Sequence, residues 1–395
     1  MINPKTKQRE LAYVVKIDNI IPIDGADRVE QAVVGGWHIM VRKGQFKIGD
    51  KAVYFEIDSK VPEREPYMFL ADKHFKIKTQ KYFKGTVISQ GLLMAFEDFD
   101  WVEDKYEVGT FLTKELGVTY AIEEDNKRKS NITKYDKMYQ RHLALFKKYK
   151  ILRKIFKTNI GKKILFIFLG KKRDTRNWPV WVVKTDEERV QNMPFLFPGD
   201  PDKKWVVTEK IDGTSTTFTM KGRKKKEEFY ICSRNVNFDK PEKAENCFYE
   251  TNVYIEMAEK YNMESVLRNI LENHPEFEFV TIQGETYGAN IQKRDYGLTG
   301  HDFMAFNLIF GYKDGRVERL NPIDMTSILV NTYNIPCVPV LDTIILPETM
   351  DEMIAYANGK SLVDGGMREG VVLRTLDGVE SFKSVSNDFL IKYHQ

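Results

Sequence analysis

Positive charge is concentrated in one stretch of this sequence. Residues 127–176 contain eighteen Lys and Arg but only two Asp, a net charge of +16, whereas the whole chain of 395 residues carries +4. The other residues hold 43 Lys and Arg against 55 Asp and Glu, a net charge of −12. The basic charge therefore belongs to a local insert, and it separates two segments of different character.

Length and composition limit the class of protein. A chain of this length has room for two to three domains of about 100–200 residues each. The longest uninterrupted apolar run, Ile164 to Leu169, has six residues, whereas a membrane-spanning helix needs about 20. The first residues lack the apolar core of a secretory signal, and Cys232, Cys247 and Cys337 lie far apart without a CxxC pair. We therefore expect a cytoplasmic protein with no membrane span, no disulfide framework and no structural zinc.

The segment before the insert predicts a small β-barrel. Within residues 9–118, runs rich in Val, Ile, Tyr and Phe alternate with Gly-Gly, Gly-Asp and Pro, which is typical of short strands. About five strands in so short a segment suggest a closed sheet, of which the OB-type barrel is one example. The expected strands are LAYVVKIDNI, EQAVVGG, WHIMVRKG, KAVYFEI and VISQGLLMAF, and residues 62–84 are expected to form a long, irregular loop. We assign residues 1–118 to this nucleic-acid-binding type of domain.

Residues 119–177 are interpreted as a basic helical insert. In the run KMYQRHLALFKKYKILRKIFK, apolar residues recur at helical spacing with lysines between them. Three explanations remain open. The helix could dock on the body of the protein, clamp nucleic-acid phosphates, or attach to an acidic membrane surface.

Residues 178–395 predict a mixed domain, so that the fold class expected for the chain is α+β. The strand-like segments are WVVTEKI, TSTTFTM, FYICSR, FEFVTIQGETY, FMAFNLIFGY and GVVLR. The helix-like segments are TNVYIEMAEKYNMESVLRNILENH and PETMDEMIAYANG.

A lysine at an expected strand end carries the sharpest chemical signal. Lys210 follows WVVTE and precedes Ile211, Asp212 and a glycine. A lysine amine acts as a nucleophile when it is neutral, and burial or a nearby cation would lower its pKa. By itself the pattern KxDG is better explained as a salt-bridged turn, because so short a pattern is common by chance.

Other segments follow this lysine in a recognisable order. EKIDG resembles the nucleotidyl-transfer motif of the covalent nucleotidyltransferase superfamily, which contains polynucleotide ligases and messenger RNA capping enzymes. The later motifs of that superfamily are similar to SRN at 233–235, QGETYG at 283–288, FMAFN at 303–307, EGVVLR at 369–374 and SFK at 381–383. The resemblance implies a C-terminal adenylyltransferase domain with an ATP-grasp-like ligase fold of mixed antiparallel sheets and helices.

Domain order narrows the resemblance. KTDEERVQN at 184–192 resembles a stretch of RNA ligases related to T4 RNA ligase 2. An OB-type domain ahead of the transferase domain is similar to the nick-sealing RNA ligases of the Deinococcus and Naegleria type. Classical DNA ligases and capping enzymes place their OB domain after the transferase domain, whereas here only residues 385–395 follow the last motif. The basic insert is not covered by the resemblance.

The resemblance implies an ATP-dependent RNA ligase that joins 3′-OH and 5′-phosphate ends, most plausibly at nicks in duplex RNA or RNA/DNA, with ATP and Mg²⁺ (or Mn²⁺) as cofactors. Lys210 would attack the α-phosphorus of ATP and carry AMP, which then passes to the 5′-phosphate before a 3′-hydroxyl seals the break. Asp212, Glu285 and Glu369 would hold the metal ion through its waters, since magnesium releases water reluctantly. Lys383 would contact the α-phosphate.

The resemblance also implies the nucleotide-binding residues. They are Arg189 for the outer phosphates, Arg234 for phosphate or ribose, Thr208 and Glu209 for the base edge or ribose, their neighbour Ile211, and Phe306 or Tyr287 for adenine. Related ligases often carry a second lysine in the fifth motif, where this chain has Ser381. Lys392 or the N-terminal domain is a candidate source of the missing cation.

Two other functions remain open. A DNA ligase or a GTP-dependent capping enzyme is disfavoured by domain order, and a non-catalytic protein that binds RNA or a membrane surface is disfavoured by the intact lysine and carboxylates. Plain structural roles also fit some candidates: Arg189 as a helix-surface partner of Asp186, and Tyr287 and Phe306 as core aromatics. We expect a monomer that grips a nicked duplex with its two domains.

Overall fold

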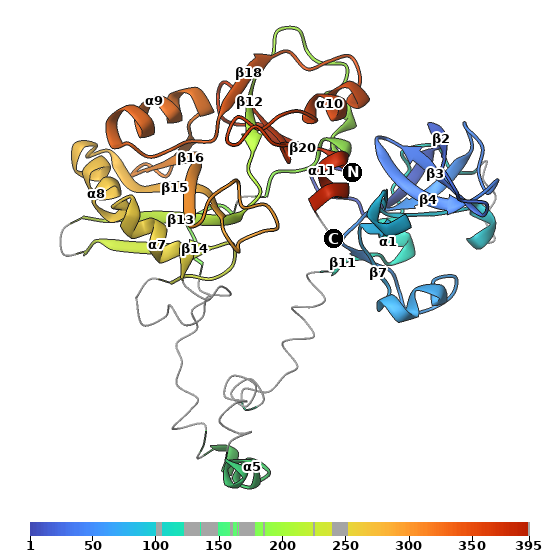
Figure 1. The fold of residues 1–395 in the computed structure, drawn as a ribbon, viewed down its shortest axis with the longest axis horizontal. Helices are drawn as coiled ribbons and strands as arrows, with labels where there is room; N and C mark the ends of the chain where they lie inside the picture. The colour runs from blue at the N-terminus through green and yellow to red at the C-terminus, as the bar shows by residue number, and fades with distance from the viewer. Residues whose placement is uncertain are drawn as a thin grey trace.

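The computed structural model describes residues 1–99, 105–121, 135, 149–158, 161–163, 165, 178–184, 186–223, 226–238 and 252–393. Two bodies lie side by side, with the helix near the C-terminus between them (Figure 1). Of the helix expected over 137–157, the described part is α5, Lys150–Phe156. Most of the basic insert lies outside the described residues, as do Thr185 of the KTDEERVQN stretch and Cys247. Among the described helices, each is too short or too polar to cross a membrane.

The N-terminal body is an OB-fold domain of short antiparallel strands. Its sheets have the orders β1-β5-β10, β2-β3-β4, β11-β6-β7 and β8-β9. The strands are β1 Ala12–Lys16, β2 Asn19–Pro22, β3 Val29–Val34, β4 Trp37–Arg42, β5 Lys51–Phe55, β6 Ser59–Lys60, β7 Lys76–Ile77, β8 Gln80–Tyr82, β9 Val87–Ser89, β10 Leu92–Met94 and β11 Thr119–Tyr120. The helical turns are η1 Met68–Lys73, η2 Phe83–Gly85, η3 Phe96–Phe99 and α1 Thr113–Leu116.

Three local expectations for this domain were wrong. LAYVVKIDNI is not one strand, since it is divided between β1 and β2. Residues 62–84 are not irregular, since they contain η1, β7 and β8 and bury Leu70 and Phe75 in the core. VISQGLLMAF forms two strands rather than one, because Gly91 adopts a φ of 123°. A Cβ atom at Gly91 would lie 2.5 Å from the ring of Tyr54, so a side chain cannot be accommodated there.

The C-terminal body consists of two antiparallel sheets and flanking helices. One sheet has the order β18-β12-β19-β20 and the other β14-β13-β15-β16-β17. The strands are β12 Trp205–Lys210, β13 Thr214–Lys221, β14 Glu228–Ser233, β15 Phe277–Gly288, β16 His301–Tyr312, β17 Val317–Arg319, β18 Val340–Ile344, β19 Gly370–Thr375 and β20 Ser381–Val385. The helices are η5 Val190–Asn192, η6 Pro194–Leu196, α7 Val253–Lys260, α8 Met263–Asn273, α9 Pro322–Tyr333, α10 Met350–Ala357 and α11 Asn387–Tyr393.

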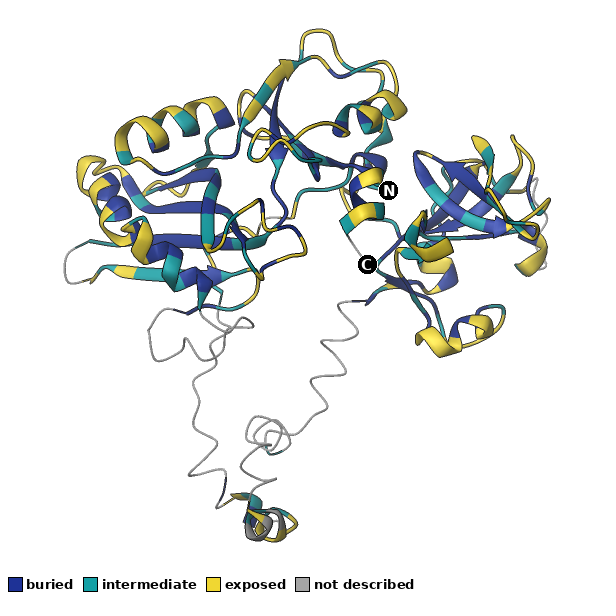
Figure 2. Cartoon of the chain, in the orientation of Figure 1, coloured by how far each residue is buried: buried dark blue, intermediate teal, exposed yellow. Residues whose placement is uncertain are grey.

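The largest hydrophobic core among the described residues lies against the five-stranded sheet, where α8 and α9 turn buried faces toward the sheet (Figure 2). The helix expected over 251–274 is divided into α7 and α8 because Asn262 adopts the left-handed conformation, with a φ of 49°. Asparagine tolerates this conformation better than most residues do. The four-stranded sheet has its own core around Trp205 and Phe382.

The two bodies touch through a polar and aromatic interface. The backbone N–H of Ile2 donates to the carbonyl of Asn192 at 2.7 Å, and the Lys81 ammonium donates to the carbonyl of Ile391 at 2.7 Å. The guanidinium of Arg189 lies 5.8 Å from the ring centroid of Trp37, within cation–π range. The OB domain therefore contacts a segment that leads directly into the C-terminal body.

Candidate active site

A cavity of about 350 Å³ lies between the two sheets of the C-terminal body. We call it the intersheet cavity. Both sheets contribute to its wall: β12 and β19 from one, and β13, β15 and β16 from the other. Its lining includes Asp186, Glu187, Thr208, Glu209, Lys210, Ile211, Gly213, Thr214, Ser215, Arg234, Glu285, Gln292, Phe306, Val338, Val372, Arg374 and Lys383.

Lys210 is the last residue of β12 and points its amine at a carboxylate. Its Nζ atom lies 2.6 Å from Oε2 of Glu369, which immediately precedes β19. The chain turns sharply after Lys210, and Gly213 is needed there, since a Cβ atom would lie 2.3 Å from the carbonyl oxygen of Thr286. This turn allows β13 to start and to place Ser215 opposite Glu285 of β15.

The pKa of Lys210 is raised, which is the opposite of the sequence-based expectation. Burial does lower it, but the carboxylates of Glu369, Glu285 and Asp212 together outweigh burial. An amine surrounded by three acidic groups stays protonated until some of that negative charge is neutralised. The three acidic groups therefore keep the Lys210 amine protonated. A cation bound among them would lower its pKa and favour the neutral amine.

The acidic groups around the lysine are perturbed in turn. Burial is the main cause that raises the pKa of Asp212 to about 7 and that of Glu285 to about 8, and the charge of Glu369 adds to both. On the opposite side, burial followed by the charges of Lys210 and Arg189 lowers the pKa of Lys383 to about 8. Such clusters of displaced pKa values are typical of functional sites.

The carboxylates fit a hydrated cation better than a directly bound one. No group of three or more His, Cys, Asp or Glu side chains within the described residues could hold a metal ion directly. The three carboxylates nevertheless surround one amine, and hard oxygen ligands suit Mg²⁺ or Mn²⁺ that keep several waters. Glu369, Glu285 and Asp212 are therefore the residues that would hold such an ion, through its waters.

The raised pKa values predict that metal binding depends on pH. A cation favours the ionised carboxylates, so it must displace protons that Asp212 and Glu285 hold below about pH 7 and 8. We expect the apparent affinity for Mn²⁺ to be about tenfold or more tighter at pH 8 than at pH 6. Calorimetric titration at the two pH values measures it, and Asp212→Asn should reduce the difference. Equal affinities at both pH values would contradict the expectation.

Polar and apolar side chains that follow or precede Lys210 line the cavity together with Phe306. Thr208 uses its hydroxyl to donate to the carbonyl of Val372 at 3.1 Å. Oε2 of Glu209 accepts from the N–H of Leu362 at 2.8 Å, whereas its Oε1 is buried and has no hydrogen-bond partner among the described residues. Ile211 and Phe306 also line the cavity. An unpaired buried acceptor here is suited to a donor that a ligand brings.

Of the two aromatic residues expected to contact adenine, Phe306 lines the cavity and Tyr287 does not. Tyr287 is buried outside the cavity lining, and its ring packs edge-on against Tyr296 at 5.1 Å between centroids. The core-aromatic alternative therefore describes Tyr287. A bulge in the sheet explains the difference, because the register shifts between Gln283 and Gly284 and leaves Phe306 outside the regular pairing.

Arg189 is not on a helix, so the pairing with Asp186 on a helix surface was wrong. Its backbone is extended, and the residue before it, Glu188, accepts a hydrogen bond from the N–H of Lys383 at 2.7 Å. This contact uses the carbonyl that a helix would need and places Arg189 beside Lys383. Asp186 pairs instead with Arg234 at the cavity mouth, where both are exposed.

Lys392 does not reach the cavity. It lies on α11, and its ammonium is 5.0 Å from the ring centroid of Tyr393. Arg189 is the cation that adjoins Lys383. Four cavity residues lie outside the quoted motifs and were not expected at the site: Thr214, Ser215, Gln292 and Val338.

The fold and the site together define a nucleotidyltransferase with an OB-fold domain at its N-terminal side. A lysine at a strand end, three carboxylates around it and a cavity between two antiparallel sheets are the elements that the motifs imply.

Comparisons with known proteins agree with this class. Residues 203–394 match the family model of RNA ligases, and residues 11–96 match an OB-fold domain model. By these matches and by the similarities below, the C-terminal domain is similar to RNA ligases over residues 203–394, and the chain is a ligase. No curated protein matches the sequence.

Several solved structures of the Naegleria gruberi RNA ligase are similar over nearly the whole chain. A lysine-to-alanine variant with ATP and Mn is 27% identical, covers 97% of this chain and 99% of its own, and has a TM-score of 0.64. A lysine-to-methionine variant with AMP and Mn is 27% identical, with 98% and 99% coverage and a TM-score of 0.64. The same ligase with PPi is 27% identical, with 98% and 99% coverage and a TM-score of 0.62.

Proposed function

We propose that this ligase uses ATP and a divalent cation to join 3′-OH and 5′-phosphate ends of RNA at nicks in a duplex. The observation that carries the proposal is the Lys210 amine, which lies 2.6 Å from Glu369 and lines a cavity between the two sheets together with Phe306. Solved structures of a similar ligase contain ATP, AMP and Mn, which supports the choice of nucleotide and metal.

The first step needs a neutral amine and a bound triphosphate. The Lys210 nitrogen forms a bond to the α-phosphorus while the bond to pyrophosphate breaks, and the amine loses its proton to solvent or to a neighbouring carboxylate. The bound cation supplies positive charge among Asp212, Glu285 and Glu369. Lys383 contributes a positive charge at the α-phosphate, and Arg189 at the phosphates beyond it. Positioning and charge neutralisation drive phosphoryl transfer.

The two later steps use the same pocket. AMP passes from Lys210 to the oxygen of the 5′-phosphate, and the 3′-hydroxyl then attacks that phosphate and displaces AMP. The adenine stays against the ring of Phe306 in each step. The OB domain would bind the duplex together with the basic insert. The protein would act as a monomer in the cytoplasm. Deletion of residues 127–172 should then weaken RNA binding and reduce its salt dependence.

Glu209 is proposed to select adenine. Its unpartnered Oε1 would accept from the adenine amino group, whereas guanine presents a carbonyl oxygen there and would repel a carboxylate. The variant Glu209→Gln can keep its oxygen on Leu362 and turn its amide donors inward. We expect it to reduce the preference for ATP over GTP by about tenfold or more. Rates of enzyme labelling with each nucleotide measure this, and an unchanged ratio would contradict the role.

Nick sealing is tested with three labelled substrates that are built from the same strands. The first has an RNA 3′-OH and a 5′-phosphate across a nick, the second lacks the 5′-phosphate, and the third lacks the complementary strand. We expect a ligated product from the first duplex, none from the second, and much less from the third. Equal sealing of the nicked and single-stranded substrates would refute the preference for nicks. A DNA 3′-end in a fourth duplex distinguishes an RNA from a DNA ligase.

A further inference from the structure

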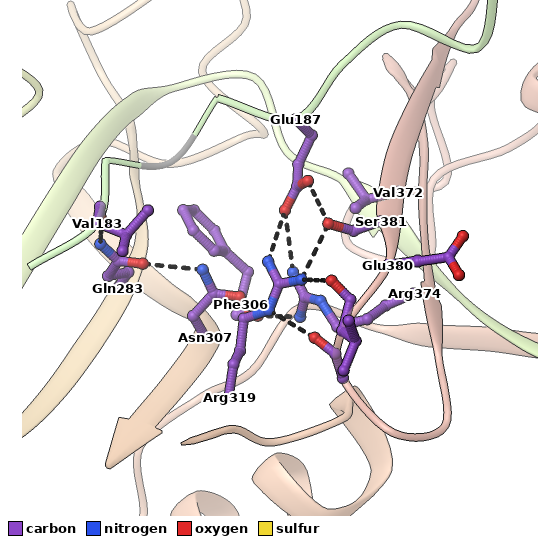
Figure 3. Close-up of polar contacts among 12 residues, drawn as sticks. Val183, Glu187, Gln283, Phe306, Asn307, Arg319, Val372, Arg374, Glu380 and Ser381 are labelled. Carbon is purple, nitrogen blue, oxygen red and sulfur yellow. Dashed lines mark hydrogen bonds and ion pairs between the residues drawn. The ribbon is translucent and has the colours of Figure 1, made fainter. Parts of the chain in front are cut away.

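One carboxylate joins both sheets of the C-terminal body beside the intersheet cavity. Glu187 belongs to the segment that precedes β12, and it receives a guanidinium from each sheet (Figure 3). Its Oε1 atom lies 3.2 Å from Nη2 of Arg374, on β19, and 3.3 Å from Nη1 of Arg319, on β17. Its Oε2 atom accepts from the hydroxyl of Ser381, on β20.

The two arginines cross between the sheets in opposite directions. Arg374 leaves the four-stranded sheet and donates to the carbonyl of Phe306 in the five-stranded sheet at 2.9 Å. Arg319 leaves the five-stranded sheet and donates to the carbonyls of Gly378 and Val379 in the turn between β19 and β20, at 2.9 and 3.1 Å. An arginine from each sheet therefore donates hydrogen bonds to backbone carbonyls of the other sheet or its turn. Glu187 forms an ion pair with both arginines.

One arginine of this cluster is buried, so the charge of its guanidinium needs a carboxylate nearby. Only 3% of the Arg374 side chain is exposed, and its Nε atom has no hydrogen-bond partner among the described residues. Burial and the charge of Arg319 lower the pKa of Arg374 to about 10, and Glu187 opposes them. The buried guanidinium of Arg374 and the partly exposed guanidinium of Arg319 would repel each other without a carboxylate between them.

The position matters for the ligand because the same residues form the cavity wall. Glu187, Arg374 and Phe306 all line the intersheet cavity. Glu187 also borders a second cavity of about 550 Å³ on the other side, together with Arg319. The carboxylate and its two arginines thus form the partition that limits how deep and how wide the first cavity is.

We propose that Glu187 is a positioning residue that fixes the spacing of the two sheets beside Phe306 and thereby sets the affinity of the ligase for its nucleotide. The inference rests on the proposed function, since it assumes that the base lies against Phe306. Glu187 itself does not contact the reacting atoms. Its loss widens the space for the base and leaves the geometry of Lys210 and Glu369 in place.

The test is the ATP dependence of enzyme labelling, measured for the full chain with Mn²⁺. For Glu187→Gln we expect the KM for ATP to rise by about tenfold or more, with the maximal labelling rate within about threefold of the original. Ser381→Ala removes one donor and keeps both arginines, so we expect a smaller rise of about two- to fivefold. The control Glu380→Gln changes the charge of a nearby side chain that points away from the cluster and pairs with Lys203, and it should leave KM unchanged.

The possible outcomes distinguish a failure of the positioning role of Glu187 from a failure of the proposed function. An unchanged KM in both Glu187→Gln and Ser381→Ala overturns the positioning role. A lower maximal rate at the original KM also overturns it, because a damaged fold or damaged chemistry gives that pattern. If Glu187→Gln does not fold, Ser381→Ala alone decides the question. If the unaltered protein takes no label from ATP, the proposed function fails instead.

Discussion

Replacing Lys210 with arginine is expected to abolish the covalent transfer of AMP to the protein. Arginine keeps the positive charge beside Glu369 but cannot lose a proton in the accessible pH range, so it offers no lone pair to phosphorus. We expect the labelling rate with ATP to fall by at least about 10⁴-fold. Quantitative labelling with radioactive ATP measures it. The control Lys203→Arg changes a partly exposed lysine that pairs with Glu380 and should label normally.

The same variant offers a check that the fold is intact. The last step, attack of the 3′-hydroxyl on an already adenylylated 5′ end, does not use the lysine as a nucleophile. We therefore expect Lys210→Arg or Lys210→Ala to retain measurable sealing of a pre-adenylylated nick. A variant that still accumulates covalent AMP would show that a different residue is the nucleophile.

The second large effect is expected at Glu369. Its carboxylate contacts Lys210 and is 6% exposed, and we place it among the groups that hold the cation. Glu369→Gln keeps the shape and removes the charge, and we expect labelling to slow by about 10²- to 10³-fold. The dependence on Mn²⁺ should shift as well, with half-saturation at a higher concentration.

The matched control for Glu369 is Glu278→Gln. Glu278 also forms an ion pair with a lysine, Lys221, at 2.9 Å, but this pair is exposed and remote from the cavity lining. An exposed ion pair is worth little, so this variant should label at the normal rate. If Glu369→Gln labels normally at low Mn²⁺, the carboxylate has no role in holding the cation.

Many strands of both bodies could be predicted because their side chains follow the pattern of the sheets, whereas β17, β18 and β20 were not among the expected strands. β12, with the sequence WVVTEK, is buried along its length until Lys210, and so it reads as an apolar run that ends at a reactive residue. Helix α9 was missed although Asn321 caps its first turn and Pro322 begins it, which are recognisable signals. Some apolar residues of α9 are exposed, so its apolar residues do not recur at the helical spacing on which the prediction relied.

The arrangement of the site was only partly accessible from sequence. Motif order indicated Lys210, its carboxylates and Lys383, because the resemblance names these residue types. The choice between Phe306 and Tyr287 depends on a bulge, and the backbone of Arg189 depends on a hydrogen bond to β20. Glu187 could not be singled out, since its arginine partners are 132 and 187 residues further along the chain.

The most direct test of the account is to locate AMP on the protein and then follow where it goes. The full chain is incubated with labelled ATP and Mn²⁺, the modified peptide is identified by mass spectrometry, and the labelled protein is then given a nicked duplex with an RNA 3′-OH. We predict AMP on Lys210, its transfer to the 5′-phosphate, and a sealed strand. AMP on another residue, or label on Lys210 that the nicked duplex does not discharge, would contradict the account.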